Sequence, residues 1–174
     1  SGADGLMIPV VENENQVKSF LNVLRYPPDG LRSFGVNRAQ GYGNSFAEYI
    51  RDWNESAIAM VQIETRAGVE NSEAIMRNKD LDAVMIGPMD ISGSYGVPGQ
   101  IDHPRVAEAC TKVIEIGRSL GKSVGIQIAS PTPDNLISAR ESGYDFVVLG
   151  SDLFACMQWC RSIQHLVDVK DEKI

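Results

Sequence analysis

Short apolar runs recur along the chain, and each one is bounded by turn-forming residues. The runs are rich in Val, Ile and Met and do not alternate strictly with polar residues. That pattern is typical of strands buried on both faces of a parallel sheet. The sequence therefore predicts five strands, over residues 6–11, 58–63, 83–86, 124–128 and 146–149.

Amphipathic helical patterns lie between these runs. Apolar residues recur at three- and four-residue spacing from Val17 to Leu24 and from Val106 to Gly117, which predicts helices with one buried face. We expect Asp134 to cap another helix that runs to about residue 141. Strands that alternate with helices indicate βαβ units with right-handed crossovers.

Two folds fit this alternation: an open doubly wound sheet and a (β/α)₈ barrel. Residues 2–5, 81–83 and 143–145 repeat one junction, with an Asp just before a strand, which favours the serial units of a barrel. A typical barrel has eight strands and ~250 residues. We therefore predict an α/β fold in which residues 1–174 form a single domain, the last five βα units of a TIM (β/α)₈ barrel, and we expect three N-terminal units to be missing from this chain.

Residues 26–43 are predicted to form a long irregular loop, because they contain two prolines and several glycines. Loops of this length are usually functional or disordered. Arg32 and Arg38 lie in this loop. Three roles remain open for them: binding an anion, contacting another subunit, or lying solvated at the surface.

Composition indicates a soluble globular protein, with 43% hydrophobic and 22% charged residues. No apolar run approaches the ~20 residues that span a bilayer, and no secretory signal opens the chain, so we expect no membrane association. The net charge of −7 and the scattered basic residues argue against a nucleic-acid partner. Three cysteines without a CxxC pair favour reduced thiols and a cytoplasmic location.

Cys156 and Cys160 are four residues apart, so on a helix they share one face and could bind a metal. The alternative is packing in the core, where Cys behaves as a small hydrophobic residue. We favour the core, because both cysteines belong to an apolar helical stripe. Its members are Leu153, Cys156, Met157, Cys160, Ile163 and Val167.

Two carboxylates follow neighbouring strands at their carboxyl ends, where parallel α/β folds build their active sites. Glu64 follows the second predicted strand, and Asp90 follows the third. Side by side the two would repel, and a hard divalent cation such as Mg²⁺ or Mn²⁺ would remove the conflict. The alternative is that Glu64 caps a following helix and Asp90 caps a turn.

A cation at this position could chelate a 2-oxo acid and act as a Lewis acid while an enolate forms. Gln62 shares a strand face with Glu64, so its amide could donate to the substrate. The backbone N–H groups of Met89 and Asp90, just beyond a strand, suit a carboxylate. No Lys ends an apolar run, which counts against a Schiff-base aldolase.

Five motifs in this order resemble the HpcH/HpaI family of metal-dependent (class II) pyruvate aldolases, typified by 4-hydroxy-2-oxoheptanedioate aldolase and related to the phosphoenolpyruvate/pyruvate barrels. The resemblance covers nearly the whole chain. The motifs are GADGLMIP at residues 2–9, RYPPDGLR at 25–32, QIET at 62–65, GPMDIS at 87–92 and GQIDHP at 99–104.

The resemblance implies a carbon–carbon lyase. Glu64 and Asp90 would bind the divalent metal (Mg²⁺, Mn²⁺ or Co²⁺), while Gln62 and the amides of Met89 and Asp90 would hold the pyruvate unit. A 4-hydroxy-2-oxo acid would be cleaved reversibly to pyruvate and an aldehyde through a metal-stabilised pyruvate enolate. Gln62 would be the catalytic side chain within this chain. The family usually assembles as homo-hexamers, with sites near subunit contacts.

The chain departs from the family pattern at its front, where the family has a substrate-binding Arg and a His acid/base group. It has no counterpart to either, so the activity of this chain alone stays open. Two alternatives therefore remain. One is a citrate-lyase-like enzyme that acts on an acyl-CoA, and the other is a catalytically deficient fragment with an interaction or structural role.

Overall fold

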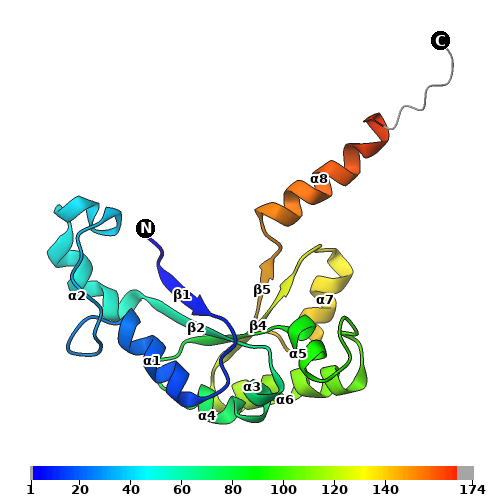
Figure 1. Cartoon of the computed structure of the whole chain (residues 1–174), viewed down its shortest axis with the longest axis horizontal. Coiled ribbons are helices and arrows are strands. Elements are labelled where there is room, and N and C mark those ends of the chain that lie inside the picture. Colours follow the sequence, from blue (N-terminus) through cyan, green and yellow to red (C-terminus); the bar gives the residue numbers. More distant parts are fainter. Residues whose placement is uncertain (1, 168–174) are drawn as a thin grey trace.

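The computed structural model describes residues 2–167 and contains one parallel sheet in the order β1-β2-β3-β4-β5. Each crossover thus moves the chain to the next strand, as in a barrel. The sheet is curled into part of a TIM barrel (Figure 1), which confirms the predicted fold class. The strands are β1 (Gly5–Ile8), β2 (Ile58–Ile63), β3 (Ala83–Ile86), β4 (Ser123–Ile128) and β5 (Phe146–Leu149).

Helices follow the strands, and those in the middle of the chain cover the convex face of the sheet, whereas the concave face is open (Figure 1). No helix among residues 2–167 is long and apolar enough to cross a membrane. The helices are α1 (Glu14–Leu24), η1 (Arg38–Gly43), α2 (Phe46–Ser56), α3 (Arg66–Glu70), α4 (Ser72–Met76), α5 (Pro88–Ser94), α6 (Pro104–Leu120), α7 (Pro133–Glu141) and α8 (Asp152–Val167).

The core lies between the convex face and its helices. Alternate residues of β2 are buried there, and the predicted stripe from Val106 to Gly117 is the buried face of α6. A Cβ on Gly117 would lie 2.3 Å from Cγ2 of Val124, so the glycine lets α6 approach β4 closely.

The repeated Asp junctions join neighbouring strands. A carboxylate oxygen of Asp82, just before β3, accepts the N–H of Ala59 in β2 at 2.7 Å. Asp145, just before β5, accepts the N–H of Val124 in β4 in the same way, at 2.8 Å. At these two junctions the carboxylate satisfies a backbone donor near the start of the preceding strand.

Strand β1 ends earlier than predicted, at Ile8 rather than residue 11. Val10 adopts a left-handed conformation with φ 54°, which takes the chain out of the extended state. Pairing is then resumed by a single hydrogen bond, in which the N–H of Val11 donates to the carbonyl of Gln62.

The segment over residues 26–43 is less irregular than predicted, because its last part forms η1. The Arg32 guanidinium packs on the rings of Tyr26, Tyr49 and Trp53, at 4.6, 5.5 and 4.1 Å from their centroids. Arg32 is therefore half-buried in an aromatic cluster rather than solvated. Arg38 is exposed, and its role stays open.

The prediction that Asp134 caps a helix is wrong by two positions. Thr132 is the N-cap of α7, and its hydroxyl accepts the N–H of Asn135. Asp134 lies in the first helical turn instead, where a negative charge still favours the helix dipole.

The prediction of a buried stripe on the last helix is also wrong. Cys156 and Cys160 are exposed, as are Leu153 and Met157, and the side chain of Val167 lies outside the described residues. The physical reason is that α8 projects away from the sheet (Figure 1), so no element in the described part of the chain covers its apolar face.

Candidate active site

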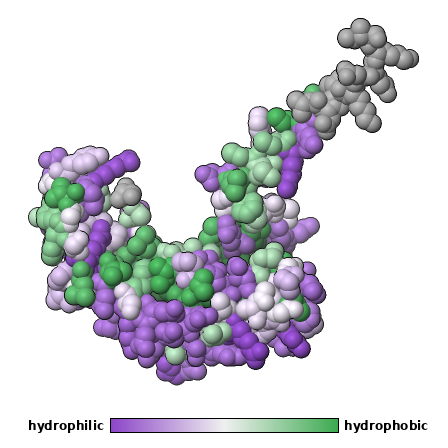
Figure 2. Space-filling model, in the orientation of Figure 1, coloured by the Kyte–Doolittle hydropathy of each residue, from purple (hydrophilic) through white to green (hydrophobic). Residues whose placement is uncertain are grey.

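The inner face of the sheet carries side chains in rows that follow the strand register. Gln62, Met85, Gly125 and Phe146 pair across β2 to β5. Two residues further along each strand lies the next inward-facing row. That row, at the carboxyl ends of the strands, consists of Glu64, Gly87, Gln127 and Val148. Figure 2 shows apolar side chains along the floor of the hollow between the part of the molecule with α2 and the part with α8.

Glu64 and Asp90 converge on the space beside Gly87. A Cβ built on Gly87 would lie 2.9 Å from Oε2 of Glu64 and 3.7 Å from Oδ2 of Asp90. Both carboxylate oxygens are therefore within 4 Å of one point, and only a glycine leaves that point free. The structure thus brings together the two acidic residues that the sequence singled out.

Glu64 is only 7% exposed, and one of its oxygens is already engaged. Oε1 accepts the N–H of Val10 at 2.8 Å, which leaves Oε2 for a ligand. Burial raises the pKa of Glu64, the Val10 N–H opposes that rise, and the charge of Asp90 adds to it. A cation in the gap would counter both effects that raise this pKa.

The capping alternative for these two acids does not hold. Thr65 caps α3, because its hydroxyl accepts the N–H of Gly68 at 3.1 Å. Asp90 lies in the first turn of α5, whose N-cap is Gly87. Neither carboxylate forms a salt bridge with a basic side chain in the described part of the chain.

The other predicted site residues lie on β2 and α5, the elements next to this gap. Gln62 is half-buried and faces inward from β2, and Met89 is 57% exposed at the start of α5. The first backbone bond of α5 runs from the N–H of Ile91 to the carbonyl of Gly87. The amides of Met89 and Asp90 therefore belong to the first turn, where N–H groups lack partners within the helix.

The donor set fits a hard divalent cation. Among residues 2–167, no group of three or more His, Cys, Asp or Glu side chains could hold a metal, so protein ligation would come from two carboxylates. Mg²⁺ is often bound by one or two carboxylates, with its remaining positions taken by water and substrate. The open inner face beside Gly87 leaves room for both.

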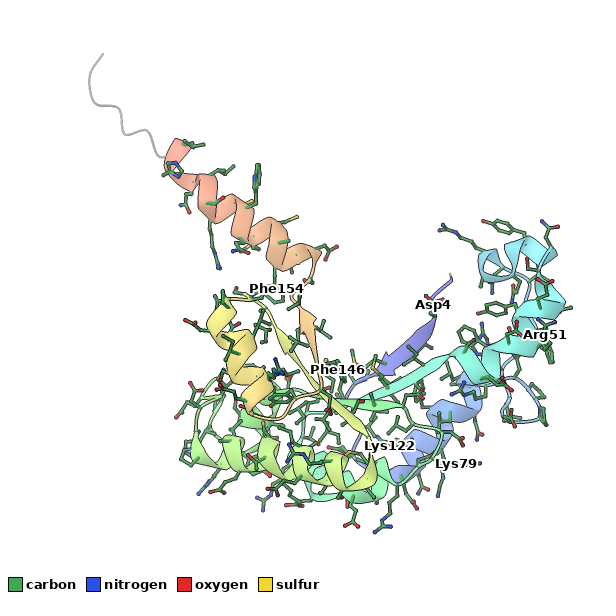
Figure 3. The ribbon with its side chains drawn as sticks, turned by 180° about the vertical axis from the view of Figure 1, so that it is seen from behind. Asp4, Arg51, Lys79, Lys122, Phe146 and Phe154 are labelled. Carbon is green, nitrogen blue, oxygen red and sulfur yellow. The ribbon has the colours of Figure 1, made fainter. Side chains whose placement is uncertain are left out.

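Two lysines, Lys79 and Lys122, lie near the other end of the strands. Lys122 directly precedes β4, and its Nζ donates to the carbonyl of Leu81 at 2.5 Å. Figure 3 shows Lys122 and Lys79 on the part of the molecule that carries the starts of β3 and β4. His103 is also engaged, because its Nδ1 accepts the N–H of Arg105 at the start of α6.

Sequence reasoning missed Gln127, the next-to-last residue of β4, which belongs to the same inward-facing row as Glu64 and Gly87. It also lines a cavity of about 630 Å³ together with Pro88 and Met89. The signal was present in the sequence, because Gln127 is a polar residue near the end of an apolar run. Its position relative to Glu64 becomes visible only with the strand register.

The fold and these paired carboxylates define a barrel protein with an acidic site at the carboxyl ends of its strands. The model of the HpcH/HpaI aldolase/citrate lyase family matches residues 1–158, and the chain belongs to this family. This confirms the family that the five motifs indicated.

Relatives of this chain include named aldolases. The chain is 36% identical over 155 residues to a pyruvate aldolase of Rhizobium etli, and the alignment covers 87% of this chain and 59% of the relative. It is 37% identical over 156 residues to a 2-keto-3-deoxy-L-rhamnonate aldolase of Salmonella dublin, covering 87% and 56%. The chain thus spans less than two thirds of the length of these curated relatives.

Solved structures show the same fold. An HpcH/HpaI aldolase from Desulfitobacterium hafniense superposes with a TM-score of 0.83 at 26% identity, covering 99% of this chain and 67% of that one. A family protein from Burkholderia cenocepacia superposes with a TM-score of 0.85 at 29% identity, covering 95% and 65%.

Proposed function

We propose that the protein catalyses the metal-dependent, reversible aldol cleavage of a 4-hydroxy-2-oxo acid to pyruvate and an aldehyde. The observation that carries this proposal is the convergence of Glu64 and Asp90 on the space that Gly87 leaves free. Family membership and the names of the relatives support the reaction class.

In this proposal Glu64 and Asp90 would hold Mg²⁺, Mn²⁺ or Co²⁺. When bound, the ion would polarise the 2-oxo group of the substrate and neutralise the charge that develops on its oxygen. The fit rests on two hard oxygen ligands that face one gap and lack a basic partner in the described part of the chain.

The remaining residues bind and orient pyruvate. Gln62 faces the gap from the row below Glu64, so its amide would donate to a substrate oxygen. The N–H groups of Met89 and Asp90 would donate to the pyruvate carboxylate, because they lie in the first turn of α5. We assign these residues to binding and positioning.

The experiment uses the full-length protein, supplied with Mn²⁺ or Mg²⁺, pyruvate and a panel of aldehydes, and follows aldol formation. Glu64→Ala is expected to lose the activity, whereas Glu115→Ala, at an exposed position on α6, is expected to retain it. If Glu64→Ala reacts as fast as the parent protein, the proposal is wrong. An acyl-CoA included in the panel tests the citrate-lyase-like alternative.

We also propose that the protein is a homo-oligomer, a hexamer by the family resemblance, and that it is cytoplasmic. The exposed apolar residues of α8 support oligomer formation, since contiguous apolar surface usually marks an interface; Leu153 is 65% and Trp159 63% exposed. Three free cysteines support the location. Light scattering of Trp159→Asp against the parent protein tests the assembly, with a smaller species expected for the variant.

A further inference from the structure

Gln127 is a polar residue on the inner face of the sheet that the pyruvate site leaves unused. Ile63, Ile86 and Ile126 are paired across β2, β3 and β4, and the next residue along each chain segment is Glu64, Gly87 and Gln127, respectively. Neighbouring strands are about 4.8 Å apart. Continuing the register in this way puts Glu64 and Gln127 on opposite sides of Gly87, and the side chain of Gln127 is exposed.

The amide of Gln127 has a defined orientation. Its Nε2 donates to the carbonyl of Gly150 at 3.1 Å. A carbonyl oxygen can only accept, so the NH₂ end of the amide must face Gly150. The Oε1 atom then points away from Gly150, and it accepts no hydrogen bond from the described residues. Gln127 thus presents an acceptor to a ligand on the inner face.

The surface next to Gln127 is apolar. A Cβ on Gly125, two residues earlier in β4, would lie 2.3 Å from Cε2 of Phe146. The Phe146 ring therefore occupies the place of a side chain at Gly125, and Figure 3 shows Phe146 at the middle of the curled sheet. This part of the inner face therefore offers an aromatic ring and one hydrogen-bond acceptor.

We propose that Gln127 is a specificity-determining residue that selects an aldehyde with a hydroxyl group next to its carbonyl. This inference rests on the proposed function. With pyruvate held by Glu64 and the first turn of α5, the aldehyde must approach the pyruvate methyl group from a remaining side of the gap. The β4 side offers Oε1 of Gln127, which accepts from a hydroxyl but gains nothing from an alkyl group.

The test compares two aldehydes of similar size, glycolaldehyde and propanal, with pyruvate and Mn²⁺ as the common reactants. The parent protein is expected to prefer glycolaldehyde in kcat/KM, and Gln127→Met to lower that preference about tenfold, the size expected for one uncharged hydrogen bond. Met has nearly the same length as Gln and lacks both the carbonyl oxygen and the NH₂ group of the amide. An unchanged ratio of the two kcat/KM values would overturn the assignment of Gln127.

A second readout separates this inference from the proposed function. Exchange of the pyruvate methyl protons with D₂O requires pyruvate and metal but no aldehyde. Gln127→Met is expected to keep the exchange rate and the pyruvate KM of the parent protein, which also shows that the variant is folded. If the parent protein exchanges no protons with any of the three metals, the proposed function is wrong and this inference falls with it.

Discussion

Replacing Gly87 by Ala tests whether the space between the two carboxylates is the metal position. The added methyl group would lie 2.8 Å from Cβ of Glu64 and 2.9 Å from its Oε2. Ordinary contact begins at 3.4 Å, so Glu64 must move by about 0.6 Å. Metal–ligand distances tolerate only about 0.2 Å, so we expect Mn²⁺ affinity to fall at least tenfold.

The same substitution is expected to destabilise the metal-free protein by about 1–3 kcal/mol, the usual cost of overpacking. That corresponds to a Tm lower by about 2–4 °C for each kcal/mol. Gly93→Ala is the matched control, because it lies in the same helix and a Cβ there meets nothing within 4 Å. It is expected to keep its affinity for Mn²⁺ and to gain up to about 1 kcal/mol of stability.

The assay combines calorimetric titration with Mn²⁺ and thermal melting with and without the metal. In the parent protein, Mn²⁺ at one hundred times its Kd should stabilise the fold by about 2.7 kcal/mol. Gly87→Ala should lose most of this gain, and Gly93→Ala should keep it. The reasoning is refuted if Gly87→Ala is destabilised and still binds Mn²⁺ as tightly as Gly93→Ala does.

Four further predictions concern side chains around this site and the fold that supports it. Glu64→Gln is expected to stabilise the metal-free protein by about 1 kcal/mol, seen as a higher Tm, because it removes a buried charge that repels its acidic neighbour. The same variant is expected to lose Mn²⁺ binding. The pKa of Glu64 is raised, so the stability contributed by its protonated form is present below its ordinary pKa and is lost as pH rises through the raised pKa. Mn²⁺ affinity should increase over the same pH range. A constant Mn²⁺ affinity in titrations between pH 4.5 and 7 would contradict this prediction. Asp82→Ala should lower the free energy of unfolding in urea by about 1–3 kcal/mol, since it leaves a buried N–H of β2 without its acceptor. An equal loss in Asp80→Ala, at an exposed position, would count against that cause. Arg32→Lys should lower stability by about 1–2 kcal/mol because a lysine stacks less well on three rings, and Arg38→Lys, at an exposed position, should change it by less than about 0.5 kcal/mol.

The strands of this fold were predictable from the sequence because each is a compact apolar run. Three of the five predicted ranges match the structure, as 58–63 does for β2. The departure at β1 comes from Val10, whose left-handed φ leaves no trace in a hydrophobicity pattern. Helix α2 was not predicted, because only Trp53 of its residues is buried and its apolar stripe is short.

Helix α8 shows the limit of periodicity as evidence. An apolar stripe indicates that a helix face will be covered, but it does not say by what. Within the described chain nothing covers Met157, which is 45% exposed, although its spacing is the same as that of buried residues in α6. The pairing of Glu64 with Asp90 could be predicted from the strand ends, whereas the role of Gly87 depends on how closely the two carboxylates approach it in the folded structure.

The Asp junctions give the sheet a directional cooperativity. The carboxylate that completes β2 belongs to the unit of β3, and the one that completes β4 belongs to the unit of β5. In these two places, a strand has an unsatisfied backbone donor until the following βα unit has docked. Unit-by-unit stability should therefore resemble that of a repeat protein, in which nearest-neighbour coupling dominates, and a loss at one junction should loosen the unit before it as well as its own.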